Sequence, residues 1–74
     1  MNQERVGKFL ASLREKQGLT QQMLADELFV SREAVSKWER GVNMPTISLL
    51  IPLSKILKVD VTEILMGKEK INKI

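Results

Sequence analysis

The chain has 74 residues, of which 43% are hydrophobic and 28% are charged, with a formal net charge of +3. This composition is typical of one small globular domain, near the lower size limit for unaided folding, and it excludes an intrinsically disordered chain. Cysteine and histidine are both absent, which excludes disulfides and thiolate metal sites and removes the commonest general base and zinc ligand.

The N-terminal residues lead into no apolar run of the length of a signal peptide, and no segment is long enough to span a membrane. We therefore expect a soluble cytoplasmic protein. The positive charge permits a polyanionic partner without establishing one, because residues 21–45 hold three cations and four carboxylates.

The first predicted helix has apolar residues at Val6, Phe9, Leu10 and Leu13. Their i, i+3, i+4, i+7 spacing is typical of a helix with one buried face. Gly18 is expected to end this helix, because glycine readily adopts the positive φ found just past a helix terminus.

Two short helices are predicted between residues 21 and 40. Thr20 and Ser31 are suitable N-caps, because a hydroxyl oxygen can accept from the unpaired amides of the first turn. Gly41 is expected to follow the end of the later of these two helices, at about residue 40. The positions that face the core are Leu24, Ala25, Leu28, Val35 and Trp38. Two such helices joined by a few residues form a helix-turn-helix.

A fourth helix is predicted after Pro45, with Thr46 as its cap. Its apolar stripe consists of Ile47, Leu50, Leu53, Ile56 and Leu57. Pro52 lies inside this stretch and lacks an amide donor, so a kink or a late start is expected.

A fifth short helix is predicted after Asp60, which forms a capping-box pattern with Glu63. This helix is expected to bury Val61, Ile64 and Leu65 and to end at Gly67. Residues 67–74 are interpreted as a charged C-terminal tail.

The predicted fold class is therefore all-α, with five helices around one core. The predicted core consists of Val6, Leu10, Leu13, Leu24, Ala25, Leu28, Val35, Trp38, Leu50, Leu53, Leu57 and Leu65. Trp38 is assigned to the core rather than to base stacking, because it follows Val35 by three residues on the same helix face.

These positions together resemble the Cro/phage-repressor (XRE) helix-turn-helix family. The residues that carry the resemblance are Leu13-Arg14-Glu15, Gly18-Leu19-Thr20-Gln21, Leu24-Ala25, Val30-Ser31, Val35-Ser36-Lys37-Trp38-Glu39-Arg40-Gly41, Pro45 and Leu50. The resemblance covers residues 9–66, with the helix-turn-helix at about 21–40. It implies a five-helix, Cro/repressor-like domain that binds double-stranded DNA sequence-specifically and regulates transcription, as a repressor in the first instance.

Two residues depart from the family pattern. The family commonly has glycine in the turn between the second and third helices, where this chain has Phe29. A bulky residue is strained at positive φ, so either the turn is reshaped or other contacts hold Phe29 in place. Pro52 is the second departure.

The resemblance places the third helix in the major groove of DNA. Four of its residues match base-reading positions: Arg32, Glu33, Ser36 and Lys37. Arginine and lysine can donate to guanine, and glutamate can accept from the cytosine amino group. Simpler roles stay open: Arg32 as a surface cation, a Glu33–Lys37 ion pair at i, i+4, and a hydrogen bond from Ser36 to the carbonyl one turn back.

Six further residues are expected to contact the DNA backbone: Thr20, Gln21, Ser31, Arg40, Asn43 and Thr46. Gln21 occupies the family's phosphate-contact position, and the free amides of a helix N-terminus suit an anionic oxygen. Its alternative role is that of an ordinary polar residue in the first turn.

The sequence indicates no enzyme, cofactor or metal site, because no glycine-rich phosphate loop and no nucleophile–base pair occurs. The alternative function is a protein-interaction module, such as an antitoxin, with an apolar patch at Val30, Met44 and the fifth helix. A homodimer on an inverted-repeat operator is also expected. Its pairing surface is assigned to Val59, Val61, Ile64, Leu65, Met66 and Ile71. Alternatively, these residues pack internally and the chain dimerises only on DNA.

Overall fold

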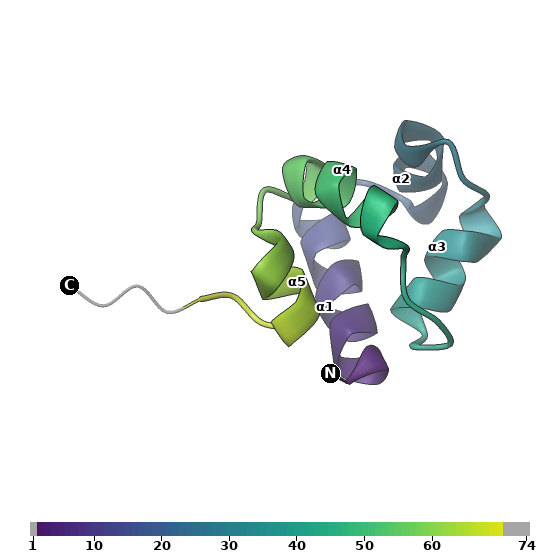
Figure 1. The fold of residues 1–74 in the computed structure, drawn as a ribbon. Coiled ribbons are helices and arrows are strands. Elements are labelled where there is room, and N and C mark those ends of the chain that lie inside the picture. The colour runs from purple at the N-terminus through teal and green to yellow at the C-terminus, as the bar shows by residue number, and fades with distance from the viewer. Residues whose placement is uncertain (1, 71–74) are drawn as a thin grey trace.

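The computed structural model describes residues 2–70, which form five helices and no strand. The helices are α1 (Gln3–Lys16), α2 (Gln21–Leu28), α3 (Arg32–Glu39), α4 (Ile47–Leu57) and α5 (Val61–Met66). Figure 1 shows α1 in the centre, with α2 and α3 on one side and α5 on the other. The all-α fold is confirmed. No helix within residues 2–70 is long and apolar enough to cross a membrane.

Local capping explains where the helices of the motif begin. The Thr20 hydroxyl accepts from the Met23 amide at 3.0 Å, and the Ser31 hydroxyl accepts from the Ala34 amide at 3.1 Å. Both predicted caps are confirmed. Thr46 precedes α4 as predicted, but its hydroxyl hydrogen-bonds to the Ser48 hydroxyl at 3.0 Å and caps no backbone amide.

One apolar core joins all five helices, and Trp38 lies within it, only 5% exposed. The prediction for Leu65 is wrong, because Leu65 is half-buried while Ile64 is fully buried. Ile64 belongs to the core itself, whereas Val61 and Leu65 are packed against it. Ile47 was also expected to be buried but is 77% exposed, because it lies with the exposed Ile51 on the side of α4 that is turned away from the core.

Pro52 lies inside a continuous α4 that begins at Ile47, so the predicted late start is wrong. The first turn closes ahead of the proline, with the Leu50 amide donating to the Thr46 carbonyl at 3.1 Å. The ring deprives only the Ser48 carbonyl of its usual partner, the amide four residues later.

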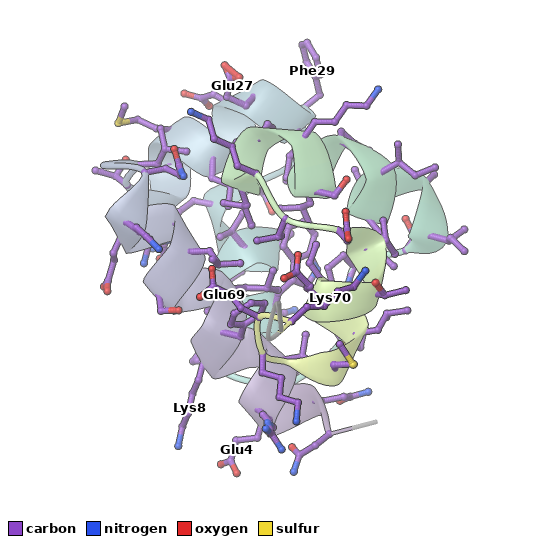
Figure 2. All side chains as sticks on the ribbon, turned by 90° about the vertical axis from the view of Figure 1, so that its left-hand side faces the viewer. Glu4, Lys8, Glu27, Phe29, Glu69 and Lys70 are labelled. Carbon is purple, nitrogen blue, oxygen red and sulfur yellow. The ribbon has the colours of Figure 1, made fainter. Side chains whose placement is uncertain are left out.

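Phe29 adopts the left-handed conformation itself, with φ 58° and ψ 40°. Its side chain is 95% exposed and points into solvent in Figure 2. The turn is therefore not reshaped, and the second expectation, that other contacts hold Phe29 in place, is met by the backbone and not by packing of the ring. The amides of Phe29 and Val30 donate to the carbonyls of Asp26 and Ala25 at 3.3 and 3.0 Å. These bonds close α2 and hold the strained backbone in place.

Phe29→Gly is therefore expected to raise the free energy of unfolding by roughly 0.5–1 kcal/mol. Removing the left-handed strain, about 1–2 kcal/mol, outweighs the larger entropy of glycine in the unfolded chain, about 0.4–1 kcal/mol. Urea denaturation measures the difference. Phe29→Ala is the control: it keeps the β-carbon, so we expect little change. A glycine variant no more stable than the wild type would contradict this explanation.

Candidate nucleic-acid interface

α3 separates an outward polar face from a buried apolar one. Arg32, Glu33 and Lys37 are exposed and Ser36 is half-buried, whereas Val35 and Trp38 point into the core. A helix places residues three and four apart on one side, so the four predicted base-reading residues form one surface. Within residues 2–70 the structure has no pocket and no group of side chains suited to a metal ion.

Arg40 lies along the same face and bridges two of those residues. Its Nε donates to Ser36 Oγ at 3.1 Å, and its Nη2 lies 3.3 Å from Glu33 Oε2. Glu33 therefore pairs with Arg40 and not with Lys37, and Ser36 accepts from Arg40 instead of donating to a carbonyl. Because the Arg40 and Glu33 side chains are 56% and 60% exposed, this pair is weak and open to exchange with a ligand.

The outward face of α3 is net positive although residues 21–45 as a whole carry four carboxylates and three cations. It carries the cations of Arg32, Lys37 and Arg40 against the single carboxylate of Glu33. The second carboxylate of α3, on Glu39, points inward and is neutralised within the protein.

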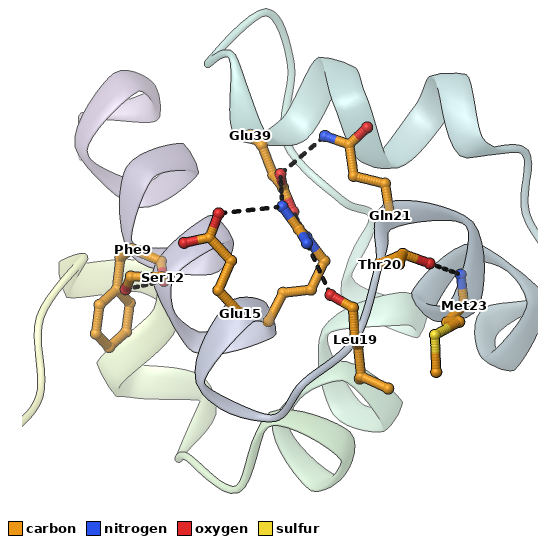
Figure 3. Close-up of polar contacts among 9 residues, drawn as sticks. Phe9, Ser12, Glu15, Leu19, Thr20, Gln21, Met23 and Glu39 are labelled. Carbon is orange, nitrogen blue, oxygen red and sulfur yellow. Dashed lines mark hydrogen bonds and ion pairs between the residues drawn. The ribbon is translucent and has the colours of Figure 1, made fainter.

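Glu39 forms a nearly buried ion pair with Arg14 of α1. Arg14 Nε lies 2.6 Å from Glu39 Oε2 and Arg14 Nη2 lies 3.0 Å from Glu39 Oε1, while the side chains are only 11% and 7% exposed. Arg14 Nη1 also donates to the Leu19 carbonyl at 2.8 Å. The hydrogen bond to Glu39 raises the pKa of Arg14, so its guanidinium stays charged. This contact joins α1, the following turn and the end of α3 (Figure 3).

Gln21, at the start of α2, belongs to the same cluster. Its Nε2 donates to Glu39 Oε1 at 2.9 Å, which places the beginning of α2 beside the end of α3. Its side-chain oxygen points away from Glu39 in Figure 3. No sequence pattern indicates this contact, because the two residues lie 18 positions apart.

The other predicted backbone-contact residues flank α3. Thr20 lies beside Gln21, Ser31 caps the beginning of α3, and Asn43 and Thr46 follow its end; all four are exposed. The structure thus places polar groups around both ends of the positive surface of α3.

Gly7 is a further residue that determines where α3 lies, although it was not among the predicted site residues. A β-carbon at Gly7 would clash with the Trp38 carbonyl oxygen and lie 2.6 Å from that of Glu39, so only glycine lets α1 approach the end of α3 this closely. Gly41, at φ +76°, similarly lies against the backbone of Glu4. A glycine inside a helix lowers the stability of the helix and usually has a packing reason. The position of Gly7 beside the buried Val6 could therefore have indicated this close contact.

Comparisons with known proteins place this geometry in context. A family model described as Helix-turn-helix matches residues 10–64. The chain is 45% identical over 62 residues to the HTH-type transcriptional activator BcrR of Enterococcus faecalis, covering 84% of this chain and 30% of BcrR. It is 41% identical over 64 residues to the HTH-type transcriptional regulator DicA of Escherichia coli, covering 86% of this chain and 47% of DicA.

A solved structure is similar over most of both chains. The P22 c2 repressor, in complex with a synthetic operator, matches with a TM-score of 0.80 and 32% identity, over 85% of this chain and 96% of the repressor chain. By contrast, this chain spans less than half the length of BcrR or DicA.

The buried ion pair predicts unequal effects for the same substitution at two sites. Glu39→Gln should lower the free energy of unfolding by roughly 3 kcal/mol, because it removes the close, nearly buried counter-ion of Arg14 and leaves only the exposed carboxylate of Glu15, 3.9 Å from Arg14 Nη2. Glu33→Gln breaks the exposed pair with Arg40 and should cost less than about 1 kcal/mol. Urea denaturation of both variants tests this; equal losses would show that the Arg14–Glu39 pair does not hold the helices together.

Proposed function

The chain belongs to the Helix-turn-helix family, whose model matches residues 10–64, and on that premise we propose that it binds specific double-stranded DNA through α3 and regulates transcription. The observation that carries this proposal is the outward, net-positive face of α3, which is fixed from behind by the core and by the Arg14–Glu39 pair. The similarity of the chain to the transcriptional regulators BcrR and DicA and to the operator-bound repressor supports the proposal.

In this proposal α3 lies in the major groove and reads base edges. Arg32 and Lys37 donate to guanine acceptors, Glu33 accepts from a cytosine amino group, and Ser36 contacts either kind of base. A carboxylate near phosphates is normally repelled, but Arg40 lies 3.3 Å from Glu33 and offsets its charge. This neutral pair makes base readout by Glu33 electrostatically acceptable.

The residues around α3 hold the phosphates. Gln21 uses one amide hydrogen on Glu39 and has a second for a phosphate oxygen. The hydroxyls of Thr20 and Ser31 accept from backbone amides, so their own hydrogens are free to donate. Asn43 and Thr46 contact the backbone beyond the end of α3. Arg40 joins them through its Nη1, while its Nε and Nη2 stay on Ser36 and Glu33.

The working unit of this proposal is a homodimer on an inverted repeat. One α3 reads only a few base pairs, and so small a domain offers too little surface for tight binding alone. Two half-sites would lie about one turn of DNA apart, ~34–36 Å. We further propose that the protein acts without catalysis, in the cytoplasm with the DNA, as a repressor that occupies its operator.

The alternative, a protein-interaction module, has less support in the structure. It depended on an apolar patch that included Val30 and Met44, and both residues are half-buried and packed against the core. Of the patch that the sequence assigned to such a module, Met66 of α5 is the one described apolar side chain that is exposed. That patch therefore gives the alternative little support.

Specificity and affinity should separate by position. Lys37→Ala or Arg32→Ala should relax base preference at one or two positions, at ~1–3 kcal/mol for each bidentate pair of hydrogen bonds that the substitution removes. Gln21→Ala should weaken binding to all sequences about equally. Selection from a pool of random-sequence duplexes, followed by sequencing, measures both effects.

Lys55→Ala provides the matched control, because it removes an exposed lysine that is not among the proposed contact residues and lies on α4. It should leave base preference unchanged. If the α3 variants bound every sequence more weakly and to the same degree, base reading would not belong to Arg32 and Lys37.

A further inference from the structure

The structure leaves little apolar surface on α5, to which the sequence assigned pairing. Ile64 is fully buried, and three neighbours are half-buried and packed against the core, namely Val59, Val61 and Leu65. Met66 is 43% exposed, and Ile71 lies outside the described residues. The clearest geometry for recognition lies instead on the outward face of α3, where three side chains contact one another.

Arg40, Ser36 and Glu33 form a connected row along the outward face of α3. They are spaced by four and three residues, so they lie on one side of the helix. Arg40 follows the last residue of α3 and reaches back along it. Its Nε donates to Ser36 Oγ at 3.1 Å, and its Nη2 donates to Glu33 Oε2 at 3.3 Å. One guanidinium therefore holds both side chains.

Only arginine can make these contacts and still bind a phosphate. Its guanidinium is planar and carries five donors in a fixed fork, so Nε and Nη2 can serve Ser36 and Glu33 while Nη1 is left for a third acceptor. Lysine carries its donors on a single nitrogen, which cannot reach three separate acceptors along a helix. A lysine at residue 40 would keep the charge but lose the row.

The row also decides which partner Glu33 takes. By spacing alone, Glu33 would pair with Lys37, four residues later. Glu33 is instead bound to Arg40, and within residues 2–70 Lys37 takes part in no ion pair. In the same part of the chain Glu33 Oε1 accepts no hydrogen bond. Arg40 thus leaves Lys37 available to a base, and leaves one oxygen of Glu33 available as well.

We propose that Arg40 is a positioning residue for base reading, which determines the base preference at the position that Glu33 reads without touching that base. The proposal deepens the function proposed above and rests on it. In the free protein the pair with Glu33 is exposed and weak. In the groove water is displaced and the local dielectric falls, so the same hydrogen bond becomes stronger and holds the carboxylate toward the bases.

The variant Arg40→Lys of the full chain tests this proposal in the random-sequence selection. The position that Glu33 reads is the one at which Glu33→Gln changes the preferred base. Arg40→Lys should lower the preference at that position about fivefold or more. Because the charge is kept, the dependence of affinity on salt concentration should match that of the wild type. Arg40→Gln, which removes the charge, should lose the same preference and also reduce the salt dependence.

A double variant shows whether Arg40 acts through Glu33. In the Glu33→Gln background, Arg40→Lys should change the preference at that position less than about twofold, because the group on which Arg40 acts is gone. Arg5→Lys is the matched control: it makes the same change at an exposed arginine of α1 outside the proposed contacts, and should leave every preference unchanged. Arg40 is exposed, so thermal unfolding should show that its variants stay folded.

The outcomes separate this inference from the function on which it rests. If Arg40→Lys weakens binding to all sequences alike with every preference intact, Arg40 is a phosphate contact only and the proposal is overturned. It is also overturned if Arg40→Lys has the same effect with and without Glu33, or if Glu33→Gln changes no position; DNA binding then still stands. A wild type that enriches no sequence refutes the proposed function itself, and this inference with it.

Discussion

The ion pair between Arg14 and Glu39 determines how α3 lies against the rest of the protein. Arg14 extends from α1 and contacts Glu39 at 2.6 Å and the Leu19 carbonyl at 2.8 Å, and Gln21 donates to the same carboxylate. Three segments therefore meet at one nearly buried group. Gly7 makes the arrangement possible, because a larger residue there would push α1 away from the end of α3. A helix of eight residues has little stability of its own, so these tertiary contacts give it a fixed position.

The same pair also determines the charge that α3 presents. Residues 21–45 carry more carboxylates than cations, which would argue against a polyanionic partner if all of them faced outward. Glu39 instead faces Arg14, and Glu33 is paired with Arg40 on the surface. Asp26 and Glu27 lie on the exposed side of α2. The outward face of α3 is left with an excess of positive charge, which is the electrostatic condition for approaching phosphates.

Helix positions, the caps at Thr20 and Ser31, and most of the core were predictable, because periodicity and short-range hydrogen bonds depend only on neighbours in the chain. The outward position of Arg32, Glu33 and Lys37 follows from the burial of Val35 and Trp38. The errors at Ile47 and Leu65 arise because the edge of the core is set by how far neighbouring helices extend. The contacts of Glu39 with Arg14 and Gln21 join residues 25 and 18 positions apart and depend on the final packing. At Phe29 the bonds that close α2 outweigh the local preference of a bulky residue for negative φ.

The central claim, that the α3 surface is the DNA-binding surface, is tested most directly by nuclear magnetic resonance. Amide resonances of the isotope-labelled chain are followed as a duplex from the random-sequence selection is added, and contacts between protein and DNA protons are recorded. We expect the largest shifts and the intermolecular contacts to fall on residues 31–40, with a second group at residues 20–21 and 43–46. Contacts centred on α5 or on the acidic side of α2, with α3 unperturbed, would contradict the claim.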